Sequence, residues 1–488
     1  MALSLSIDRT QRAAIYQQIA EQLREAISSG ALPPGARLPT VRHLAGQLQV
    51  TRLTIQTAYA ELQSAGWIEA TVGRGTFVST QVAPAAARPA LDVITPAGVI
   101  GDILQMGQAP GVRSLASASP DPALFPADEF WACLDEQRQS ASTVVGYGPG
   151  PGDAGLRLAI VDLLRERGVD ALPDEVLITA GVTQGLMLAI HALAQPGDTV
   201  LVEQPTYLGF LHQMRMAGLQ TVAVPLDAGG PDLAALERIL AERRPRFFYT
   251  IPTFQNPTGA CATLTRRQAV AALARQYGCV LVEDDLYALV SYAGAAPQPL
   301  KALDGDNVIY VNSFSKAFMP GLRLGYLVAP AALHERLAGL RLAADLGSPL
   351  LTQRALASFL RNGGLRRHLR RALPVYRERR DALLDALATY MPAAATWTQP
   401  EGGFCSWLTL PRHHALQHVY RQALARGWAF APGEVFLAAP DAGYHLRICF
   451  GSASPDVLRR GIRCLAEVIG DQMARPLPPV NVDGIPLV

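Results

Sequence analysis

Residues 311–326, VNSFSKAFMPGLRLGY, place a lysine between two serines and an arginine, directly after an apolar run. This residue, Lys316, is one of only two lysines in a chain whose Lys and Arg together number 43. A primary amine forms an imine with an aldehyde, whereas a guanidinium stays protonated and does not. Hydroxyl groups and an arginine beside such an amine suit a phosphate. The stretch therefore predicts a lysine that binds a phosphorylated aldehyde, with Ser313, Ser315 and Arg323 around the phosphate.

Further motifs supply the other groups that pyridoxal 5′-phosphate (PLP) requires. Asp284 ends the apolar run CVLVED, and a carboxylate there keeps a pyridinium nitrogen protonated. Asn256 in NPTG and Tyr287 in EDDLY offer hydrogen bonds to the ring oxygen, and Tyr207 in EQPTY offers a ring for stacking. AGVTQG, residues 180–185, opens a helix whose free N–H groups favour a phosphate. The predicted PLP set is Lys316, Asp284, Tyr287, Asn256, Tyr207, Val182, Thr183, Ser313, Ser315 and Arg323.

Each motif also has an interpretation without a cofactor. NPTG is a turn sequence, Asp284 could cap a helix or join an ion pair, and GVTQG could simply start a helix. GYGPGPGDAG, residues 146–155, is reminiscent of a nucleotide loop, but no strand precedes it, so a turn is favoured. Lys301 lies in the polar stretch PLKALDGDN and is expected to be a solvated surface charge.

Short apolar runs alternate with helical stretches from about residue 176 onward. Continuous apolar strands separated by helices favour a mostly parallel sheet that is covered on both faces. Chemistry in such sheets lies at the carboxyl ends of the strands. The last ~130 residues mix helices with fewer strands and predict a smaller α+β domain. The expected strands are VLIT (176–179), TVLVE (199–203), FFYTI (247–251), CVLVED (279–284), VIYVN (308–312) and LGYLVA (near 325–330).

The first 80 residues predict three helices followed by a β-hairpin. Apolar residues recur at helical spacing in residues 13–29. A proline-rich turn leads to a second helix over residues 40–48, with Thr40 as its N-cap. A tight break precedes a third helix over residues 51–65, and WIEATVGRGTFV (67–78) predicts two strands joined by a Gly-Arg-Gly turn. This order is typical of a winged helix-turn-helix.

A winged helix-turn-helix places its third helix in the major groove, with the first turn facing base edges. Thr51, Arg52 and Thr54 occupy that turn; arginine suits guanine, and threonine suits phosphate or base. Arg42 on the second helix and Arg74 on the wing add positive charge near the DNA backbone. The region holds seven Arg against five Asp and Glu, a weak basic footprint, so a helical interaction module without nucleic acid is the alternative.

The same region resembles the GntR family of winged-helix regulators almost end to end. The matching marks are Y-x-Q-I, G-x-L-x-P-G-x-R-L-P, R-x-L-A, V-[ST]-R-x-T, AY-x-x-L and G-x-G-T-F-V. The resemblance implies double-stranded operator DNA as a partner. It implies DNA contacts from Arg42, Thr51, Arg52, Thr54 and the wing around residues 73–75.

From about residue 115 to residue 470 the chain resembles fold-type I aminotransferases. GVTQG, EQPTY, NPTG, EDDLY and SFSKxxxPGLRLGY occur in that family's order and approximate spacing. The resemblance implies PLP as cofactor, Lys316 as the catalytic lysine, and a grip by Arg447 on a substrate α-carboxylate. It also implies that Tyr147 in YGPGPGDAGLR reaches the phosphate of the neighbouring subunit's PLP, and hence a homodimer.

Both resemblances joined by a linker are typical of MocR-type regulators, a GntR subfamily whose effector domain resembles an aminotransferase. That resemblance implies a head-to-tail dimer. The predicted fold class is α/β, with an N-terminal winged helix-turn-helix and a PLP-dependent transferase domain of fold type I. The latter would contain a large, mostly parallel sheet domain and a smaller C-terminal α+β domain. The expected divisions are residues 1–80 (winged helix), 81–114 (linker), 115–475 (aminotransferase-like domain) and 476–488 (tail).

The composition agrees with this organisation. A length of 488 residues exceeds one ordinary domain, and 49% hydrophobic with 17% charged residues suits a soluble globular protein. The net charge of +2 excludes a histone-like polycation but leaves room for a local DNA-binding face. Six cysteines without a C-x-x-C pair favour free thiols over disulfides or a metal site. Neither a signal peptide nor a membrane-spanning apolar stretch is found, so we expect a cytoplasmic protein.

Three functional hypotheses follow. In the first, the protein is a PLP-dependent DNA-binding transcription regulator that senses an amino compound or PLP through aldimine exchange at Lys316. In the second, an aminotransferase acting on an amino acid carries an appended DNA-binding domain, since the catalytic set looks intact. In the third, the cofactor itself is the signal. A linker and a winged helix have no purpose in metabolism, which favours the first.

Overall fold

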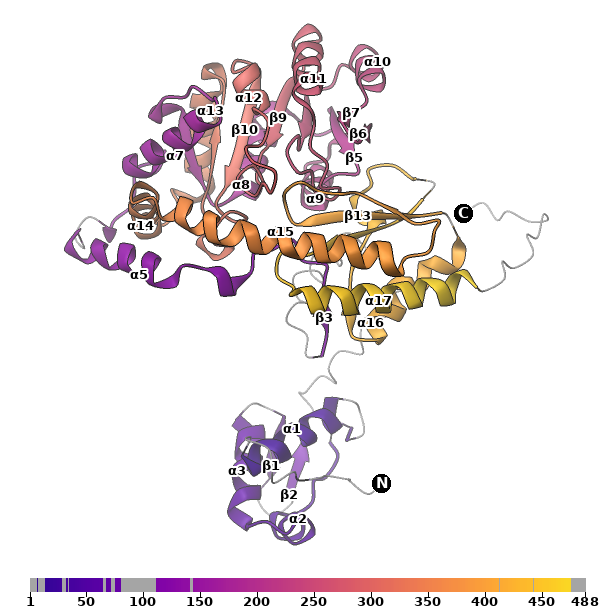
Figure 1. The fold of residues 1–488 in the computed structure, drawn as a ribbon. Helices are drawn as coiled ribbons and strands as arrows, with labels where there is room; N and C mark the ends of the chain where they lie inside the picture. Colours follow the sequence, from indigo (N-terminus) through magenta and orange to yellow (C-terminus); the bar gives the residue numbers. More distant parts are fainter. Residues whose placement is uncertain are drawn as a thin grey trace. The chain divides into compact units, whose positions relative to one another are not determined.

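The chain divides into two compact units, Met1–Ile94 and Thr95–Val488, in a computed structural model (Figure 1). Arg74, residues 81–110 of the expected linker and the expected tail lie outside the described residues. The described residues are 7, 14–28, 32–33, 35–64, 67–71, 75–79, 111–140, 144–411, 413–441 and 443–474.

The N-terminal unit consists of α1 (Ile15–Ser28), α2 (Val41–Leu48), α3 (Arg52–Ser64), β1 (Ile68–Thr71) and β2 (Gly75–Val78). The hydroxyl of Thr40 caps α2 by accepting a 3.3 Å hydrogen bond from the backbone N–H of His43, as predicted. Gln49 then ends α2 in the left-handed conformation (φ 51°), which makes the tight turn before α3. The strands pair antiparallel, with Ile68 opposite Val78, and complete the predicted winged helix-turn-helix.

The second unit is built around a sheet of eight strands, which are β4 (Val176–Thr179), β5 (Thr199–Gln204), β6 (Gln220–Asp227), β7 (Gly230–Pro231), β8 (Phe247–Thr250), β9 (Val280–Asp284), β10 (Val308–Ser313) and β11 (Gly325–Val328). Their spatial order is β4-β11-β10-β9-β8-β5-β6-β7. Strands β10, β9, β8, β5 and β6 pair in parallel, whereas β11 and β7 run antiparallel to their neighbours. The mostly parallel sheet is therefore confirmed.

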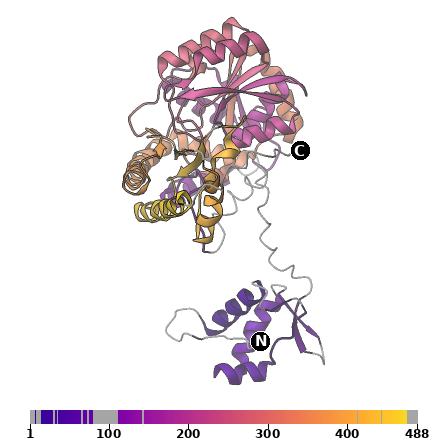
Figure 2. The same ribbon diagram turned by 90° about the vertical axis from the view of Figure 1, so that its right-hand side faces the viewer.

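Helices flank the sheet, and they are α7 (Ala154–Glu166), α8 (Val182–Leu193), α9 (Leu208–Met216), α10 (Leu233–Arg243), α11 (Leu264–Gln276), α12 (Leu300–Leu303), α13 (Ala331–Asp345) and α14 (Leu350–Arg361). Figure 2 shows helices on both sides of the strands. Successive strand residues point to opposite faces, so Phe247 and Tyr249 pack with α8, α9 and α13. Phe248, between them, packs with α10, α11 and α12. Both faces of the sheet are covered, as its continuous apolar strands predicted.

A smaller α+β part follows, as expected, and its elements are α15 (Gly364–Tyr390), β12 (Thr396–Trp397), β13 (Cys405–Leu410), α16 (Val419–Ala425), β14 (Trp428–Ala429), β15 (Ala431–Pro432), β16 (Tyr444–Cys449) and α17 (Pro455–Met473). Helix α15 packs along α17 (Figure 1). Strands β12, β13, β16 and β15 form an antiparallel sheet in that order. Strand β3 (Arg113–Ser114) pairs in parallel with β14. Helix α5 (Ala127–Glu136) and the 3₁₀ helices Pro122–Leu124, Gln137–Ser140, Pro173–Glu175, Pro320–Leu322, His414–His418 and Gly433–Phe436 complete the described elements.

Among the described residues, no helix combines the length and the apolarity that crossing a lipid bilayer requires.

Candidate cofactor and DNA-binding sites

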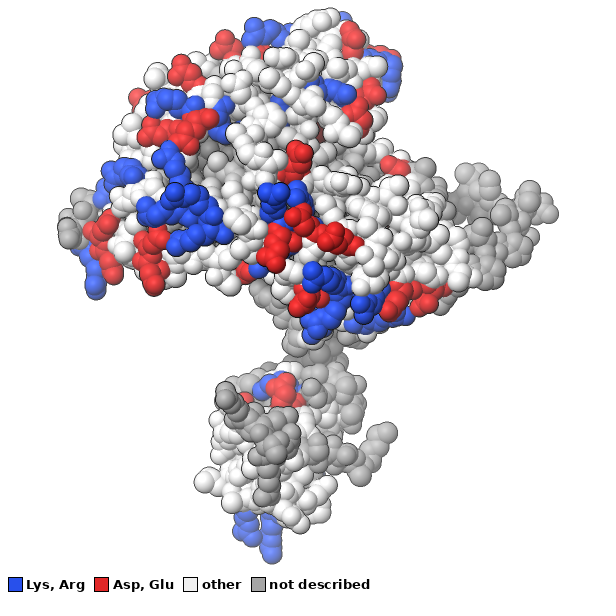
Figure 3. All heavy atoms as spheres, viewed as in Figure 1, with Lys and Arg blue, Asp and Glu red and all other residues white. Residues whose placement is uncertain are grey.

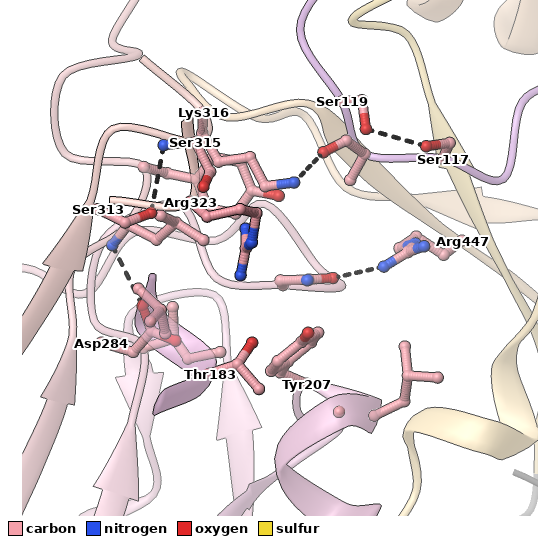
Figure 4. A pocket seen from close by; sticks show the side chains of 18 residues that line it. Ser117, Ser119, Thr183, Tyr207, Asp284, Ser313, Ser315, Lys316, Arg323 and Arg447 are labelled. Carbon is pink, nitrogen blue, oxygen red and sulfur yellow. Dashed lines mark hydrogen bonds between the residues drawn. The ribbon is translucent and has the colours of Figure 1, made fainter. Parts of the chain in front are cut away.

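A cavity lies at the carboxyl ends of β5, β8, β9 and β10, which is where parallel sheets carry their chemistry (Figure 4). All ten residues that the sequence predicts for PLP line this cavity, and so does Arg447. Motifs that are far apart in the sequence therefore meet in one place. The remaining lining residues, which the sequence did not assign to PLP, are Ser117, Ala118, Ser119, Leu208, Gly209, Ile251 and Leu286.

Lys316 follows the last residue of β10 by three positions and reaches across the cavity (Figure 4). Its Nζ donates a 2.6 Å hydrogen bond to the carbonyl oxygen of Ala118. Burial lowers the pKa of the Lys316 amine to about 8, and the guanidinium groups of Arg447 and Arg323 act in the same direction. Near neutral pH this amine is therefore more often neutral, and so nucleophilic, than a solvated lysine.

Asp284 ends β9 with its carboxylate held in place from two sides. Its Oδ2 accepts a 2.9 Å hydrogen bond from the hydroxyl of Tyr249, and its Oδ1 accepts one of 3.2 Å from the backbone N–H of Leu286. Burial raises the pKa of Asp284 to about 7. A cationic ring nitrogen beside this carboxylate would stabilise its ionised form, because opposite charges favour each other in a buried site. Tyr249 is itself fixed by stacking on Phe210, with ring centroids 3.7 Å apart.

Tyr287 carries a buried hydroxyl without a hydrogen-bond partner among the described residues. Buried polar atoms are normally paired, so an orphaned hydroxyl beside a cavity indicates a missing acceptor. Asn256, which also lines the cavity, uses its side-chain oxygen to accept from Arg447, which leaves its amide N–H groups to donate elsewhere. A hydroxyl and an amide that both donate fit the ring oxygen of PLP. On this observation the residues present fit the cofactor.

The opposite part of the cavity suits a phosphate. Helix α8 begins after Gly181, which has a φ of +90° and no side chain to cap the free N–H groups. The positive φ of residue 181 favours glycine, and a Cβ there would lie 2.8 Å from Nη2 of Arg323. Arg323 donates through Nη2 to the carbonyl oxygen of Ala180 over 3.0 Å, and the hydroxyls of Ser313 and Ser315 lie beside it (Figure 4). Helix N–H groups, hydroxyls and a guanidinium together form an anion site.

Arg447 lies on β16 and is almost fully buried. Its Nη1 donates to Oδ1 of Asn256 over 2.8 Å, and its Nη2 donates to the carbonyl oxygen of Ala116 over 2.6 Å. The guanidinium also lies over the ring of Phe436, 4.6 Å from its centroid, while its Nε has no partner among the described residues. Arg447 is therefore a buried, fixed cation on the cavity wall, and the carboxylate grip that the resemblance implies for it stays a prediction.

Residues 113–119 form a part of the site that motif reading missed. The backbone N–H of Leu115 donates to Ala429, and its carbonyl accepts from Cys449, each over 2.8 Å, so the segment runs between two parts of the small domain. Two of its carbonyl oxygens then receive the side chains of Lys316 and Arg447. Backbone groups carry no sequence motif, so only the fold reveals this role.

Tyr147 does not line the cavity, and 89% of its side chain is exposed. Its predicted reach toward the cofactor of a neighbouring subunit concerns a second copy of the chain and stays a prediction. Val145 is 83% exposed nearby in the sequence.

Lys301 corrects the expectation of a solvated surface charge. It lies in α12 and is only 7% exposed. Its Nζ donates to the carbonyl oxygens of Gly305 (2.6 Å) and Val308 (3.0 Å), which replace water around the amine. Burial lowers its pKa to about 8. The polar local sequence misled the expectation, because the loop folds back over the amine.

The predicted DNA-reading residues lie together at the start of α3 and on α2. Arg42, Thr51 and Arg52 are exposed, and Thr54 is half-buried. The hydroxyl of Thr51 accepts from the backbone N–H of Thr54 over 3.2 Å, so Thr51 also caps α3. On the face shown in Figure 3, basic side chains without acidic neighbours project at the end of this unit where Figure 1 places α2. Arg24, in contrast, pairs with Glu21.

Comparisons with known proteins agree with both sites. Residues 15–78 match the gntR family of bacterial regulatory proteins, and residues 107–465 match class I and II aminotransferases. The chain is 31% identical over 473 residues to the helix-turn-helix transcriptional regulator YdfD of Bacillus subtilis, which covers 94% of this chain and 97% of YdfD. It is also 32% identical over 388 residues to the pyridoxine biosynthesis transcriptional regulator PdxR of Corynebacterium glutamicum. That match covers 79% of this chain and 81% of PdxR.

Among solved structures, the α-aminoadipate aminotransferase LysN of Thermus thermophilus superposes with a TM-score of 0.72. The two are 33% identical, and the match covers 78% of this chain and 97% of LysN, whose crystals contain N-(5′-phosphopyridoxyl)-L-leucine. A DNA-binding winged helix and a PLP-dependent aminotransferase fold thus occur in one chain, which defines a regulator with a cofactor-binding effector domain. The chain belongs to the MocR-type regulators of the GntR family.

Proposed function

We propose that this transcription regulator senses an amino compound in the cavity of its aminotransferase-type domain, with PLP held by Lys316. The observation that carries the proposal is the position of residues 113–119. In the sequence these residues follow the winged helix and most of the expected linker, and two of their carbonyl oxygens accept hydrogen bonds from the side chains of Lys316 and Arg447. The beginning of the effector domain is thus also a wall of the ligand cavity.

PLP, when bound, supplies an aldehyde that condenses reversibly with primary amines and a ring that withdraws electrons. Asp284, held by Tyr249, would face the ring nitrogen, and Tyr287 with Asn256 would face the ring oxygen. Arg323, Ser313 and the start of α8 would hold the phosphate. These residues would orient the cofactor, and the cations of the cavity would attract an anionic amino compound.

In this proposal the Lys316 side chain changes its bonding partner when an effector binds. A Lys316 side chain that is not bonded to the cofactor would have the lowered pKa and the hydrogen bond to the Ala118 carbonyl oxygen that this structure shows. Arg447 would hold the effector carboxylate while keeping its bond to Ala116, two residues from Ala118 in the same segment. Both changes act on residues 113–119. To switch DNA occupancy substantially, the effector must favour one state of the protein by several kcal/mol, about 5.5 for a 1:99 to 99:1 shift.

A homodimer is part of the proposal. Large apolar side chains stay exposed on neighbouring segments of the second unit. A Cβ at Gly150 would lie 3.9 Å from Leu342 of α13, and one at Gly148 would lie 3.5 Å from Leu350 of α14, so these two glycines lie beside both helices. Monomers rarely leave such side chains clustered in water. A second copy of the chain would cover them and bring Tyr147 to its predicted place. The exposed apolar side chains in this region are Val145, Tyr147, Leu342, Leu346 and Leu351.

The proposal assigns residues 1–80 to DNA binding, 81–114 to a linker whose last two residues pair with β14 as strand β3, 115–475 to the effector domain and 476–488 to a tail. A regulator that binds chromosomal DNA would act in the cytoplasm, and this localisation is part of the proposal. The second candidate function is transamination of an amino acid, which the complete set of cavity residues favours. In a third, PLP itself is the signal, which the PdxR relative favours because its name concerns pyridoxine biosynthesis.

One experiment separates these functions. The full chain, loaded with PLP, is titrated with L-leucine and with 3-methylbutylamine, the same molecule without its carboxylate, while the visible absorption band and the affinity for promoter DNA are followed. The proposal expects a spectral shift together with a change in DNA affinity. Keto-acid production over many turnovers without a change in DNA affinity would favour transamination, and a DNA response to PLP alone would favour cofactor sensing.

A further inference from the structure

Two cysteines face each other behind the ligand cavity. Cys405 on β13 and Cys449 on β16 are directly opposite in the antiparallel register, and their Sγ atoms lie 3.7 Å apart. Both side chains are 2% exposed. Nothing in the proposed sensing function uses either thiol.

The backbone around the pair determines whether a disulfide fits. The N–H of Cys449 donates to the carbonyl of Leu115 rather than toward β13, and the N–H of Phe450 donates to the carbonyl of Phe404 over 3.1 Å. In an antiparallel pair the N–H and C=O of one residue point to the same side, so Cys405 and Cys449 form a non-hydrogen-bonded pair. Such pairs have Cα atoms about 4.5 Å apart. Disulfides span Cα separations of about 4.4 to 6.8 Å, so this pairing lies at the short end of the range in which a disulfide forms.

The two thiols differ in their electrostatic surroundings. Cys449 lies two residues after Arg447 on the same face of β16, and its Sγ and Nη2 of Arg447 both donate to the carbonyl oxygen of Ala116, over 3.5 and 2.6 Å. Burial opposes ionisation of Cys449, but the Cys405 thiol and the Arg447 guanidinium outweigh it and lower the pKa of Cys449 to about 7. Burial raises the pKa of Cys405. The pair thus combines Cys449, which ionises to a thiolate near neutral pH, with Cys405, which stays protonated.

We propose that Cys405 and Cys449 form a peroxide-sensitive dithiol that closes to a reversible disulfide beside the carboxylate grip Arg447. The oxidant is hydrogen peroxide, a small neutral molecule suited to a buried site. The Cys449 thiolate takes one oxygen from peroxide to give a sulfenic acid, and the other oxygen leaves as water after proton uptake. Cys405 then attacks the Cys449 sulfur and expels a second water. In sum, two thiols and one hydrogen peroxide give one disulfide and two waters; a dithiol reductant restores the thiols.

Oxidation changes the charge beside Arg447, and this consequence rests on the proposed sensing function. A thiolate at Cys449 partly neutralises the guanidinium, whereas a disulfide carries no charge. The oxidised protein therefore binds a carboxylate-bearing effector more tightly, by about three- to tenfold, while an amine without a carboxylate is little affected. Oxidation by peroxide would thus change the affinity of the same cavity for the amino compound.

The test uses the full-length, PLP-loaded protein. It is treated with equimolar to tenfold hydrogen peroxide, alkylated to block free thiols, digested without reduction and analysed by mass spectrometry. We expect a peptide pair joined through Cys405 and Cys449, two hydrogens lighter than the separate peptides, which disappears after dithiothreitol. Cys405→Ser lacks it, whereas Cys464→Ser, which removes a half-buried thiol on α17, keeps it. The same samples are titrated with L-leucine and 3-methylbutylamine by absorbance.

The outcomes are distinct. Absence of the Cys405–Cys449 peptide in wild-type protein would overturn the inference without any variant having to fold. A disulfide that leaves the L-leucine midpoint unchanged would overturn the coupling to Arg447. If L-leucine shifts no band in either redox state, the sensing function fails at this probe, while the mass spectrum still decides the disulfide. A leucine midpoint that falls on oxidation in wild-type but not in Cys405→Ser supports the inference.

Discussion

The guanidinium of Arg447 donates to the side-chain oxygen of Asn256 across 2.8 Å, although the two residues are 191 positions apart. The residue implied to grip a carboxylate thus touches a residue predicted to bind the PLP ring oxygen. A ligand bound at Arg447 and a cofactor bound at Asn256 would therefore be connected by this one buried hydrogen bond. Through Ala116 the same guanidinium also reaches the segment that follows the DNA-binding part.

Replacing Arg447 tests the grip. We expect Arg447→Ala to weaken the L-leucine response by about 10- to 100-fold, because hydrogen bonds to charged groups contribute about 1.5–3 kcal/mol. The response to 3-methylbutylamine should change less than threefold, and PLP should still bind. Absorbance titrations of both ligands measure this. Arg447→Lys, which keeps the charge, is the control, and equal losses for both ligands would contradict a carboxylate-specific role.

Tyr249 is expected to act as a positioning residue for Asp284. Tyr249→Phe removes the 2.9 Å hydrogen bond to the buried carboxylate and should weaken PLP binding by about tenfold or more. Equilibrium dialysis with PLP measures the affinity. Tyr310→Phe is a matched control, since its hydroxyl bonds Asp285 over 2.9 Å and does not line the cavity. If both variants lose PLP equally, the effect is structural rather than specific to Asp284.

The rate of PLP capture should depend on pH through Lys316. Only the neutral amine reacts, and a pKa near 8 instead of 10.5 makes about a tenth of it neutral at pH 7. The rate should therefore rise with pH and level off above about 8. Stopped-flow absorbance measures the rate of PLP capture at pH values between 6 and about 10. Asp284, with a pKa near 7, adds an inflection that Asp284→Asn should remove. A rate that keeps rising to pH 10 would contradict the lowered pKa.

Arg52 is expected to read DNA from the first turn of α3. Arg52→Ala should weaken specific binding to promoter DNA by about 10- to 100-fold while PLP capture stays intact. Fluorescence anisotropy on specific and scrambled duplexes measures it. Arg24→Ala removes an arginine that pairs with Glu21 on α1 and with Glu61 near the end of α3, away from its first turn, and should bind nearly as wild type. If Arg52→Ala weakens both duplexes equally and lowers the salt dependence, Arg52 contacts phosphate rather than a base.

The sequence was most informative where function resides in contiguous motifs. Lys316, Ser313 and Arg323 follow one strand and need no distant information, and the winged helix is encoded in about 65 consecutive residues whose caps and turns are local. Short continuous apolar runs predicted six of the eight strands of the large sheet. Strand β6 has one buried residue, Val224, and lies next to the edge strand β7. Pro225 falls within its short apolar run, and a proline inside a run weakens the signal for a strand.

What the sequence could not supply depends on long-range pairing. The bond between Arg447 and the Ala116 carbonyl joins residues 331 positions apart, and backbone oxygens look alike in any sequence. Tyr249 looked like a strand residue because its hydroxyl meets Asp284 only when β8 and β9 pair. Cys405 and Cys449 appeared scattered for the same reason. Lys301 shows the converse, since local polarity suggested solvent where the fold supplies carbonyl oxygens.

The chain's two lysines allow a direct test of the central assignment. PLP-saturated protein is reduced with borohydride, which makes the bond between cofactor and amine permanent, then digested and mapped by mass spectrometry. We predict the pyridoxyl label on Lys316 in stoichiometric amount, and none on Lys301, although both amines are buried with similar pKa values. An unlabelled Lys316, or a label on Lys301 instead, would contradict the account.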